Sequence, residues 1–238
     1  KYMENESVTF TYFGDGAACD HTIWSYQNRY FYNRNYSVLS IDLPGHGLNK
    51  NRPLTSINSM SHMLAKKIKK IKDKDIILIG HSMGSLICIE TAIQNIINIK
   101  KIILLGVSYP MVVSKTLLEN SKSDVNKAIY DMITWSLPTS TRLNSSNLIG
   151  INLPNLVNTI MSKSVTGVLY KDLLACNNYT IDSNILDKIK IPFSIINGAN
   201  DIMTPLKGAK NLKELLNKAT LLRLDSVGHF LTLENPLK

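Results

Sequence analysis

Six short runs of β-branched and apolar residues recur along the chain, with helical patterns between several of them. The runs cover residues 8–13, 36–41, 75–80, 101–106, 191–198 and 219–224. Several of them are apolar without alternation, which is typical of strands covered by helices on both faces. Helical patterns cover 56–72, 83–96 and 206–217. Strand–helix alternation predicts an α/β fold, a mostly parallel sheet flanked by helices and joined by right-handed crossovers.

One region breaks this alternation. From about Val107 to Lys190 the chain has amphipathic helical patterns and Pro-containing loops but no good strand. We therefore expect a core of residues 1–107 and 190–238, with a helical cap or lid at 108–189 inserted between two core strands. Such an insertion can lie over the carboxyl edge of the sheet, where ligands bind in open α/β folds.

The net charge of +9 raises the question of a nucleic-acid partner. Only five of the 27 basic residues are arginine, whereas nucleic-acid readers cluster arginine for phosphate and base contacts. The densest lysine run, at 66–74, lies on the polar face of a predicted helix. No run approaches the roughly 18 apolar residues of a membrane span, and the first ten residues contain no apolar signal region. We expect a cytoplasmic protein with no nucleic-acid partner and no membrane span.

The three cysteines form no C-x-x-C pair and show no metal-ligand spacing. Cys88 falls inside the apolar helix at 83–96, whereas Cys19 and Cys176 are weak alternative candidates for a nucleophile. Reduced thiols and no metal site are the expectation for such a pattern.

Gly80-His81-Ser82-Met83-Gly84 follows a buried strand pattern and opens a helix. A serine on such a turn takes a strained backbone conformation, and glycines two residues before and after it avoid collisions. The turn exposes the hydroxyl above the sheet edge and aims the Met83 N–H at an oxyanion formed beside it. This pattern predicts that Ser82 is a nucleophile.

A serine hydroxyl needs a general base, and the base needs an orienting carboxylate. His229 follows the strand pattern at 219–224, and Asp201 follows the one at 191–198. Both therefore lie on loops at the same sheet edge as Ser82. Asp225 and Asp182 are alternative acids, although Asp225 falls at the end of a strand.

Seven stretches resemble bacterial α/β-hydrolases of the serine-esterase type over nearly the whole chain. They are DHTIW (20–24), VLSIDLPGHG (38–47), GHSMGSL (80–86), YPMVVSKTLL (109–118), DLLACNNY (172–179), NDIMTP (200–205) and VGHFLTLENP (227–236). The resemblance implies a triad in the order Ser82, Asp201, His229, two backbone oxyanion donors, a helical cap and no cofactor. Haloalkane dehalogenases and epoxide hydrolases place an aspartate at the elbow, so a serine implies acyl transfer.

The second oxyanion donor is ambiguous. The family usually has a His-Gly pair here, followed by the donor, but this chain reads YFGDGAACDHTIW. Counted back from Trp24, Asp15-Gly16 takes the place of that pair and Ala17 is the donor. Counted forward from the strand, Phe13-Gly14 takes it and Asp15 is the donor. Ala17 is preferred, and an inward-pointing Asp15 carboxylate would oppose the oxyanion charge.

These features predict a serine hydrolase that cleaves an ester, or a related acyl bond, of a small to medium apolar substrate through an acyl-enzyme. Some apolar residues of the region 108–189 are expected to pack on one another and others to line an acyl pocket, and the sequence does not distinguish them: Met111, Leu117, Leu118, Met132, Trp135, Leu137, Leu156, Met161 and Leu169. One alternative is a carbon–carbon bond hydrolase or a menaquinone-pathway elimination enzyme, which Arg142, the single arginine of that region, supports poorly. Another is a ligand sensor without turnover. His46 and His81 are expected to be structural.

Overall fold

A computed structural model describes most of the 238-residue chain. The described residues are 2–3, 9–71, 75–94, 99–143, 150–186, 189–216 and 218–236. No helix in these ranges is long and apolar enough to cross a membrane.

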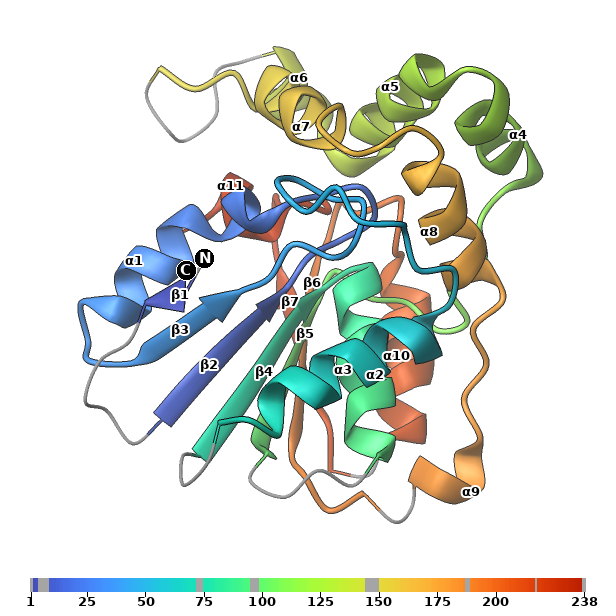
Figure 1. Cartoon of the computed structure of the whole chain (residues 1–238). Helices are drawn as coiled ribbons and strands as arrows, with labels where there is room; N and C mark the ends of the chain where they lie inside the picture. The colour runs from blue at the N-terminus through green and yellow to red at the C-terminus, as the bar shows by residue number, and fades with distance from the viewer. Residues whose placement is uncertain are drawn as a thin grey trace.

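A twisted sheet runs through the molecule (Figure 1). Within the described ranges its strands are β1 (Tyr2–Met3), β2 (Thr9–Gly14), β3 (Ser37–Ser40), β4 (Asp75–His81), β5 (Ile99–Leu105), β6 (Phe193–Gly198) and β7 (Thr220–Leu224). Their order is β1-β3-β2-β4-β5-β6-β7, and every pair is parallel except β1 with β3. The predicted parallel sheet is confirmed, and β1 is the strand that the sequence patterns missed.

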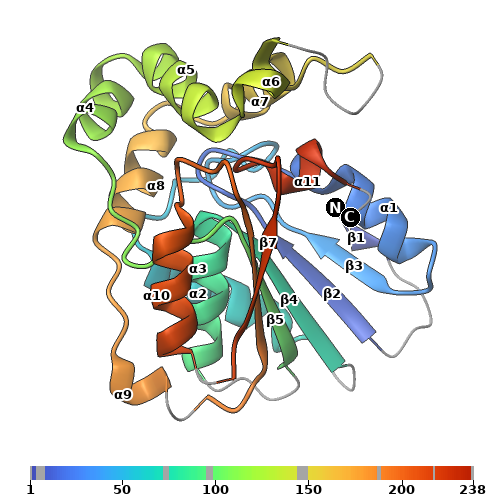
Figure 2. The ribbon, with the colours of Figure 1, turned by 180° about the vertical axis from the view of Figure 1, so that it is seen from behind.

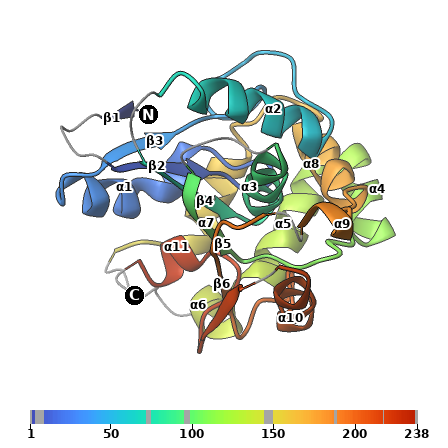
Figure 3. The same cartoon turned by 90° about the horizontal axis from the view of Figure 1, so that it is seen from below.

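Helices cover both faces of this sheet (Figure 3). One side carries α2 (Ile57–Ile68), α3 (Met83–Ile93) and α10 (Leu206–Leu215), close to the predicted ranges. The other side carries α1 (Ser25–Tyr32) and α11 (Leu231–Glu234), with the short 3-10 helix η1 (His21–Trp24) before α1. Because β4 and α3 are buried on nearly all sides, the centre of the core lies along this strand–helix pair.

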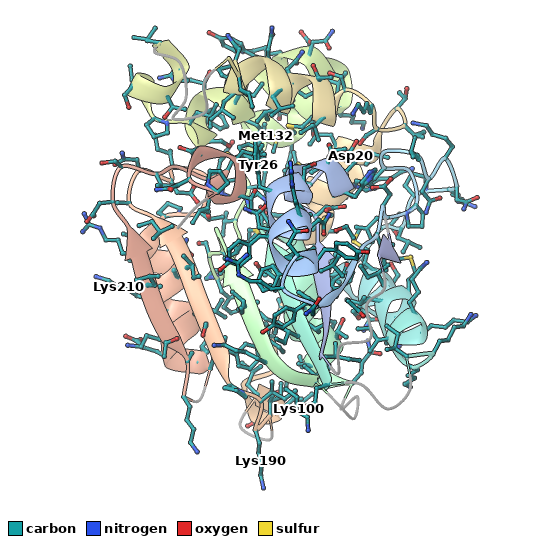
Figure 4. All side chains as sticks on the ribbon, turned by 90° about the vertical axis from the view of Figure 1, so that its left-hand side faces the viewer. Asp20, Tyr26, Lys100, Met132, Lys190 and Lys210 are labelled. Atoms are coloured by element: carbon teal, nitrogen blue, oxygen red, sulfur yellow. The ribbon has the colours of Figure 1, made fainter. Side chains whose placement is uncertain are left out.

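Helices fill the long segment between β5 and β6. They are α4 (Lys115–Ser123), α5 (Val125–Ser136), α6 (Thr139–Leu143), α7 (Leu153–Met161), α8 (Val168–Asn177) and α9 (Ser183–Leu186). Helices α4 to α7 lie above the carboxyl ends of the strands, and α8 descends beside α3 (Figures 1 and 2). Met132 of α5 lies where these helices face the core, whereas Lys100 and Lys190 lie at the opposite end of the sheet (Figure 4).

Three glycines allow close backbone contact where β2, β4 and α3 meet. A Cβ atom built on Gly84 would lie 2.4 Å from the carbonyl oxygen of Gly14, and one on Gly80 would lie 2.3 Å from that of Gly84. Since backbone atoms cannot move aside cheaply, glycine is required at both positions. This contact sets the distance between the end of β2 and the start of α3.

We expect Gly84→Ala to lower the free energy of unfolding by about 2 kcal/mol, measured by urea denaturation. Helix propensity alone would raise it by about 1 kcal/mol, so the sign of the change tests the contact. Gly14→Ala is the control, because its added Cβ would meet only the Tyr12 side chain, at 3.1 Å. A Gly84→Ala variant more stable than the natural chain would contradict this packing.

Candidate active site

Ser82 joins β4 to α3 in a backbone conformation that few non-glycine residues adopt, with φ 52° and ψ −117°. Its N–H donates to the carbonyl oxygen of Leu105 at the end of β5, at 2.8 Å. Strain of this kind costs about 1–3 kcal/mol and persists only where the surroundings fix it. The strand before it, the helix after it and the glycines beside it fix the conformation here, as the sequence predicted.

His229 lies on the loop after β7 and is held by main-chain contacts. Its N–H donates to the carbonyl oxygen of Ser136 at the end of α5, at 2.7 Å. Its own carbonyl oxygen lies 2.9 Å from Nε2 of His81, and the centroids of the two imidazole rings are 4.7 Å apart. Burial lowers the pKa of His81 to about 3, so its ring is neutral and Nε2–H donates. His81 is thus structural, and it positions the loop of His229.

Asp201 lies on the loop after β6, with its carboxylate against His229. Oδ2 is 2.8 Å from His229 Nδ1, and both side chains are almost fully buried. Oδ1 accepts the N–H of Thr204 at 2.8 Å, and Oδ2 accepts the Thr204 hydroxyl. Burial by itself would raise the pKa of Asp201, but the charge and hydrogen bond of His229 and the two bonds from Thr204 bring it below the usual value. A charged Asp201 thus fixes the His229 ring through Nδ1.

Two residues that hold this pair were missed at the sequence level. Besides bonding Asp201, Thr204 Oγ1 lies 3.2 Å from His229 Nδ1. Asn197 at the end of β6 donates from Nδ2 to the carbonyl oxygens of Thr204 and Val107, each at 3.0 Å. The spacing Asp-x-x-Thr was a usable signal, since an aspartate often accepts the N–H three residues later. Asn197 gave no such signal in the sequence. The role of a buried asparagine in an apolar strand can be assigned only once its hydrogen-bond partners are known.

Ala17 and Ser82 line the same cavity, whereas Asp15 does not. A Cβ atom on Gly16 would lie 3.4 Å from Cβ of Ser82, which shows how near this loop comes. The Asp15 carboxyl is buried and accepts Trp24 Nε1–H at 2.8 Å. Burial, followed by the neighbouring Asp42 charge, raises the pKa of Asp15 well above its usual value. Its side chain is therefore engaged by Trp24, and burial disfavours its charged form.

The cavity beside Ser82 has a volume of about 160 Å³. Its walls are mostly apolar and come chiefly from α4, α5, α8 and the loops beside them: Ala17, Ser82, Met111, Val112, Val113, Ser114, Leu117, Met132, Trp135, Leu173, Cys176, Ile202, Met203 and Thr204. The predicted Met111, Leu117, Met132 and Trp135 are among them. The other apolar residues named for this region, Leu118, Leu137, Leu156, Met161 and Leu169, are not in this lining. Helical periodicity alone did not distinguish the two groups.

A sequence model of the family described as "alpha/beta hydrolase fold" matches residues 14–236. The chain belongs to this family. Its curated relative Protein ABHD8 of Bos taurus is 22% identical over 99% of this chain and 55% of the relative, so the chain spans about half that protein's length.

Solved structures of this fold superpose on nearly the whole chain. The esterase EaEST of Exiguobacterium antarcticum is 16% identical with a TM-score of 0.84, over 99% of this chain and 90% of that one. MenH of S. aureus is 22% identical with a TM-score of 0.78, over 99% and 92%. At such identities the superpositions show the fold. The family match and the esterase neighbours together support a hydrolase.

Cys176 lines the cavity, whereas the other candidate residues of this α/β hydrolase are absent from its lining. Asp225 is exposed and pairs with Arg223, and Asp182 bonds the N–H of Asn184. The carboxylate that bonds His229 Nδ1 is that of Asp201, rather than that of either alternative acid. Arg142 is absent from the cavity wall. Cys19, Cys88 and Cys176 are buried free thiols whose pKa values burial raises, and no cluster of metal-binding side chains occurs in the described ranges.

A second, larger cavity of about 280 Å³ lies over the strands on the side of α1 and α11. Apolar side chains such as Phe13, Ile103 and Leu222 line it, and none of Ser82, Asp201 and His229 does. The smaller cavity is the candidate site because Ser82 lines it together with Thr204, which bonds Asp201.

Glu234 of the hydrolase is a buried carboxyl that sequence reasoning missed. Oε2 accepts the N–H of Gly228, next to His229, at 2.9 Å. Burial raises the pKa of Glu234 to about 7. It therefore supports the histidine loop mainly as a neutral acid below that pH.

The raised pKa of Glu234 makes the free energy of unfolding depend on pH in a defined direction. Between 4.5, its usual value, and about 7, folded Glu234 keeps a proton that the unfolded chain has released. The free energy of unfolding therefore falls as pH rises through this window, by about 3 kcal/mol from this group. We expect Glu234→Gln to make that decline shallower, measured by urea denaturation from pH 4.5 to 7.5. The exposed Glu214→Gln is the control, and a Glu234→Gln curve parallel to the natural one would refute the assignment.

Proposed function

We propose that this protein is a serine hydrolase that cleaves esters of small to medium apolar acyl groups through an acyl-enzyme. The observation that carries the proposal is the buried Asp201–His229 pair, with 2.8 Å between Oδ2 and Nδ1. This pair lies at the sheet edge where Ser82 holds its strained turn beside an apolar cavity. Thr204 lines that cavity with Ser82 and contacts both members of the pair. Backbone strain and shifted pKa values are typical of catalytic sites.

The proposed chemistry begins with attack of the Ser82 hydroxyl on the acyl carbonyl. His229 takes the hydroxyl proton on Nε2, because Asp201 engages Nδ1 and so fixes the tautomer. The charged Asp201 then stabilises the imidazolium. His229 returns the proton to the leaving alcohol as the ester bond breaks, and it next activates a water that releases the acid and frees Ser82.

In this proposal two backbone N–H groups bind the oxyanion. Met83 is the first residue of α3, where N–H groups have no partner within the helix and the helix dipole favours negative charge. Ala17 lies across the cavity from this helix on the loop after β2. Ala17 is supported as the second donor because it lines the cavity, whereas the Asp15 carboxyl is engaged by Trp24. Burial also disfavours a charge on Asp15 that would oppose the oxyanion.

We also propose that residues 108–189 act as a cap that supplies the acyl pocket. Met111, Leu117, Met132, Trp135 and Leu173 come from this segment and line the cavity. Among the residues that the structure describes, no charged side chain belongs to that lining. An apolar acyl group fits this wall better than the polyacidic substrate of an elimination enzyme, which needs cationic partners.

The first test is labelling with a fluorophosphonate, followed by intact mass. We expect one adduct on the natural protein, mapped to Ser82, and none on Ser82→Ala. The reagent reacts with a serine only where a base and oxyanion donors activate it.

The control is Cys176→Ala, which alters another cavity residue and should keep the adduct. A folded natural protein that takes no adduct would contradict the hydrolase. Strong thermal stabilisation by a ligand without turnover would then favour the sensor.

The second test is the acyl chain length. At about 30 Å³ per water-sized group, the 160 Å³ cavity holds about five heavy atoms. We therefore expect kcat/KM for p-nitrophenyl esters to be highest for acyl chains of about four to six carbons. Met132→Ala should move the optimum to longer chains, because Met132 lines the cavity.

The matched control is Met161→Ala, since Met161 is equally buried but does not line the cavity. An unchanged optimum in Met132→Ala, or the same shift in both variants, would show that the acyl group binds elsewhere.

A further inference from the structure

A tight turn carries the Ala17 N–H, and its conformation is strained. The Cys19 N–H donates to the carbonyl oxygen of Gly16 at 3.1 Å, which closes the turn around Ala17 and Ala18. Ala18 has φ 54°, in the left-handed region that favours glycine. An L-residue there is less stable than in its ordinary conformations. Something outside the turn must therefore hold it.

Two side chains from the segment between β5 and β6 hold Ala18 at both of its backbone polar groups. Oδ2 of Asp172, on α8, accepts the Ala18 N–H at 2.9 Å. The hydroxyl of Ser164 donates to the Ala18 carbonyl oxygen at 2.9 Å. These residues are about 150 positions away in sequence, so the turn is held by a different part of the fold.

A third segment completes the arrangement. His46, on the loop after β3, places Nε2 2.8 Å from the same Oδ2 of Asp172. Both side chains are buried, with exposures of 1% and 0%. A buried carboxylate is tolerated only with such partners. One oxygen atom thus joins the Ala18 turn, α8 and the loop of His46.

We propose that Asp172 is a positioning residue for catalysis, which holds Ala18 in its left-handed conformation so that the Ala17 N–H is aimed at the oxyanion. This rests on the proposed function, because it concerns the oxyanion site of that same reaction. Under this proposal, the geometry of the oxyanion site depends on the position of α8, which carries Asp172. A residue that only packs α8 on the core would stabilise the fold without affecting the chemical step.

The test is Asp172→Asn, which keeps the shape of the side chain and removes the charge. We expect the Ala18 amide to exchange with deuterium at least about tenfold faster, since its acceptor is weakened. We expect kcat and the rate of fluorophosphonate labelling to fall by about 10-fold or more, with KM within about twofold. Asp225→Asn, an exposed aspartate paired with Arg223, is the control and should change neither.

A rescue variant separates positioning from general stability. Glycine adopts φ 54° without strain. We therefore expect Asp172→Asn to lower the labelling rate by less than about threefold when it is introduced into the Ala18→Gly variant. A tenfold loss in both backgrounds would overturn the proposal, because the damage would not run through the Ala18 conformation. If Asp172→Asn does not fold, Ser164→Ala removes the other contact to Ala18, and an unchanged kcat in it would overturn the proposal.

The two readouts distinguish this proposal from the proposed function. Absence of labelling on the natural protein would overturn the hydrolase and, with it, the catalytic role of Asp172. Labelling of the natural protein with unchanged Ala18 exchange and unchanged kcat in Asp172→Asn would overturn only the positioning role.

Discussion

Close backbone contact among Gly14, Gly80 and Gly84 is the constraint on which the rest of the site depends. Because Gly80 and Gly84 carry no side chain, the first turn of α3 comes nearer to the ends of β2 and β4 than any other residue at these two positions would allow. This contact places the loop after β2 beside Ser82, so that Ala17 and Ser82 share one cavity wall. The strained serine is tolerated because the strand, the helix and these glycines leave it no alternative conformation.

Two buried carboxyl groups near this contact accept different numbers of hydrogen bonds, and their pKa values shift in opposite directions. Asp201 meets His229 and both donors of Thr204, and its pKa is lowered. Within the described residues, the Asp15 carboxyl accepts a hydrogen bond from Trp24 alone; it lies near another carboxylate, and its pKa is raised. Burial disfavours a charge unless enough donors compensate it. The fold thus favours a charge at the histidine and disfavours one on Asp15, before the proposed oxyanion donor Ala17.

The helical segment between β5 and β6 contacts the candidate site in two ways. Its apolar residues, such as Met132, form the cavity wall. Its polar groups fix the loops below, since the Ser136 carbonyl oxygen accepts the His229 N–H and Asp172 accepts the Ala18 N–H. A shift of these helices would therefore alter both the histidine loop and the Ala18 turn.

The sequence by itself determined the parallel sheet and the sheet edge at which Ser82, Asp201 and His229 lie, because strand periodicity and chain order are local properties. It also indicated Ser82, since the glycine spacing of the strained turn is written in five consecutive residues. Only the tertiary structure decided which acid meets the histidine, that Thr204, Asn197 and Glu234 support that loop, and that Asp172 binds the Ala18 turn. Those pairings join residues on separate elements, and each depends on burial and distance, which arise only when the elements pack together.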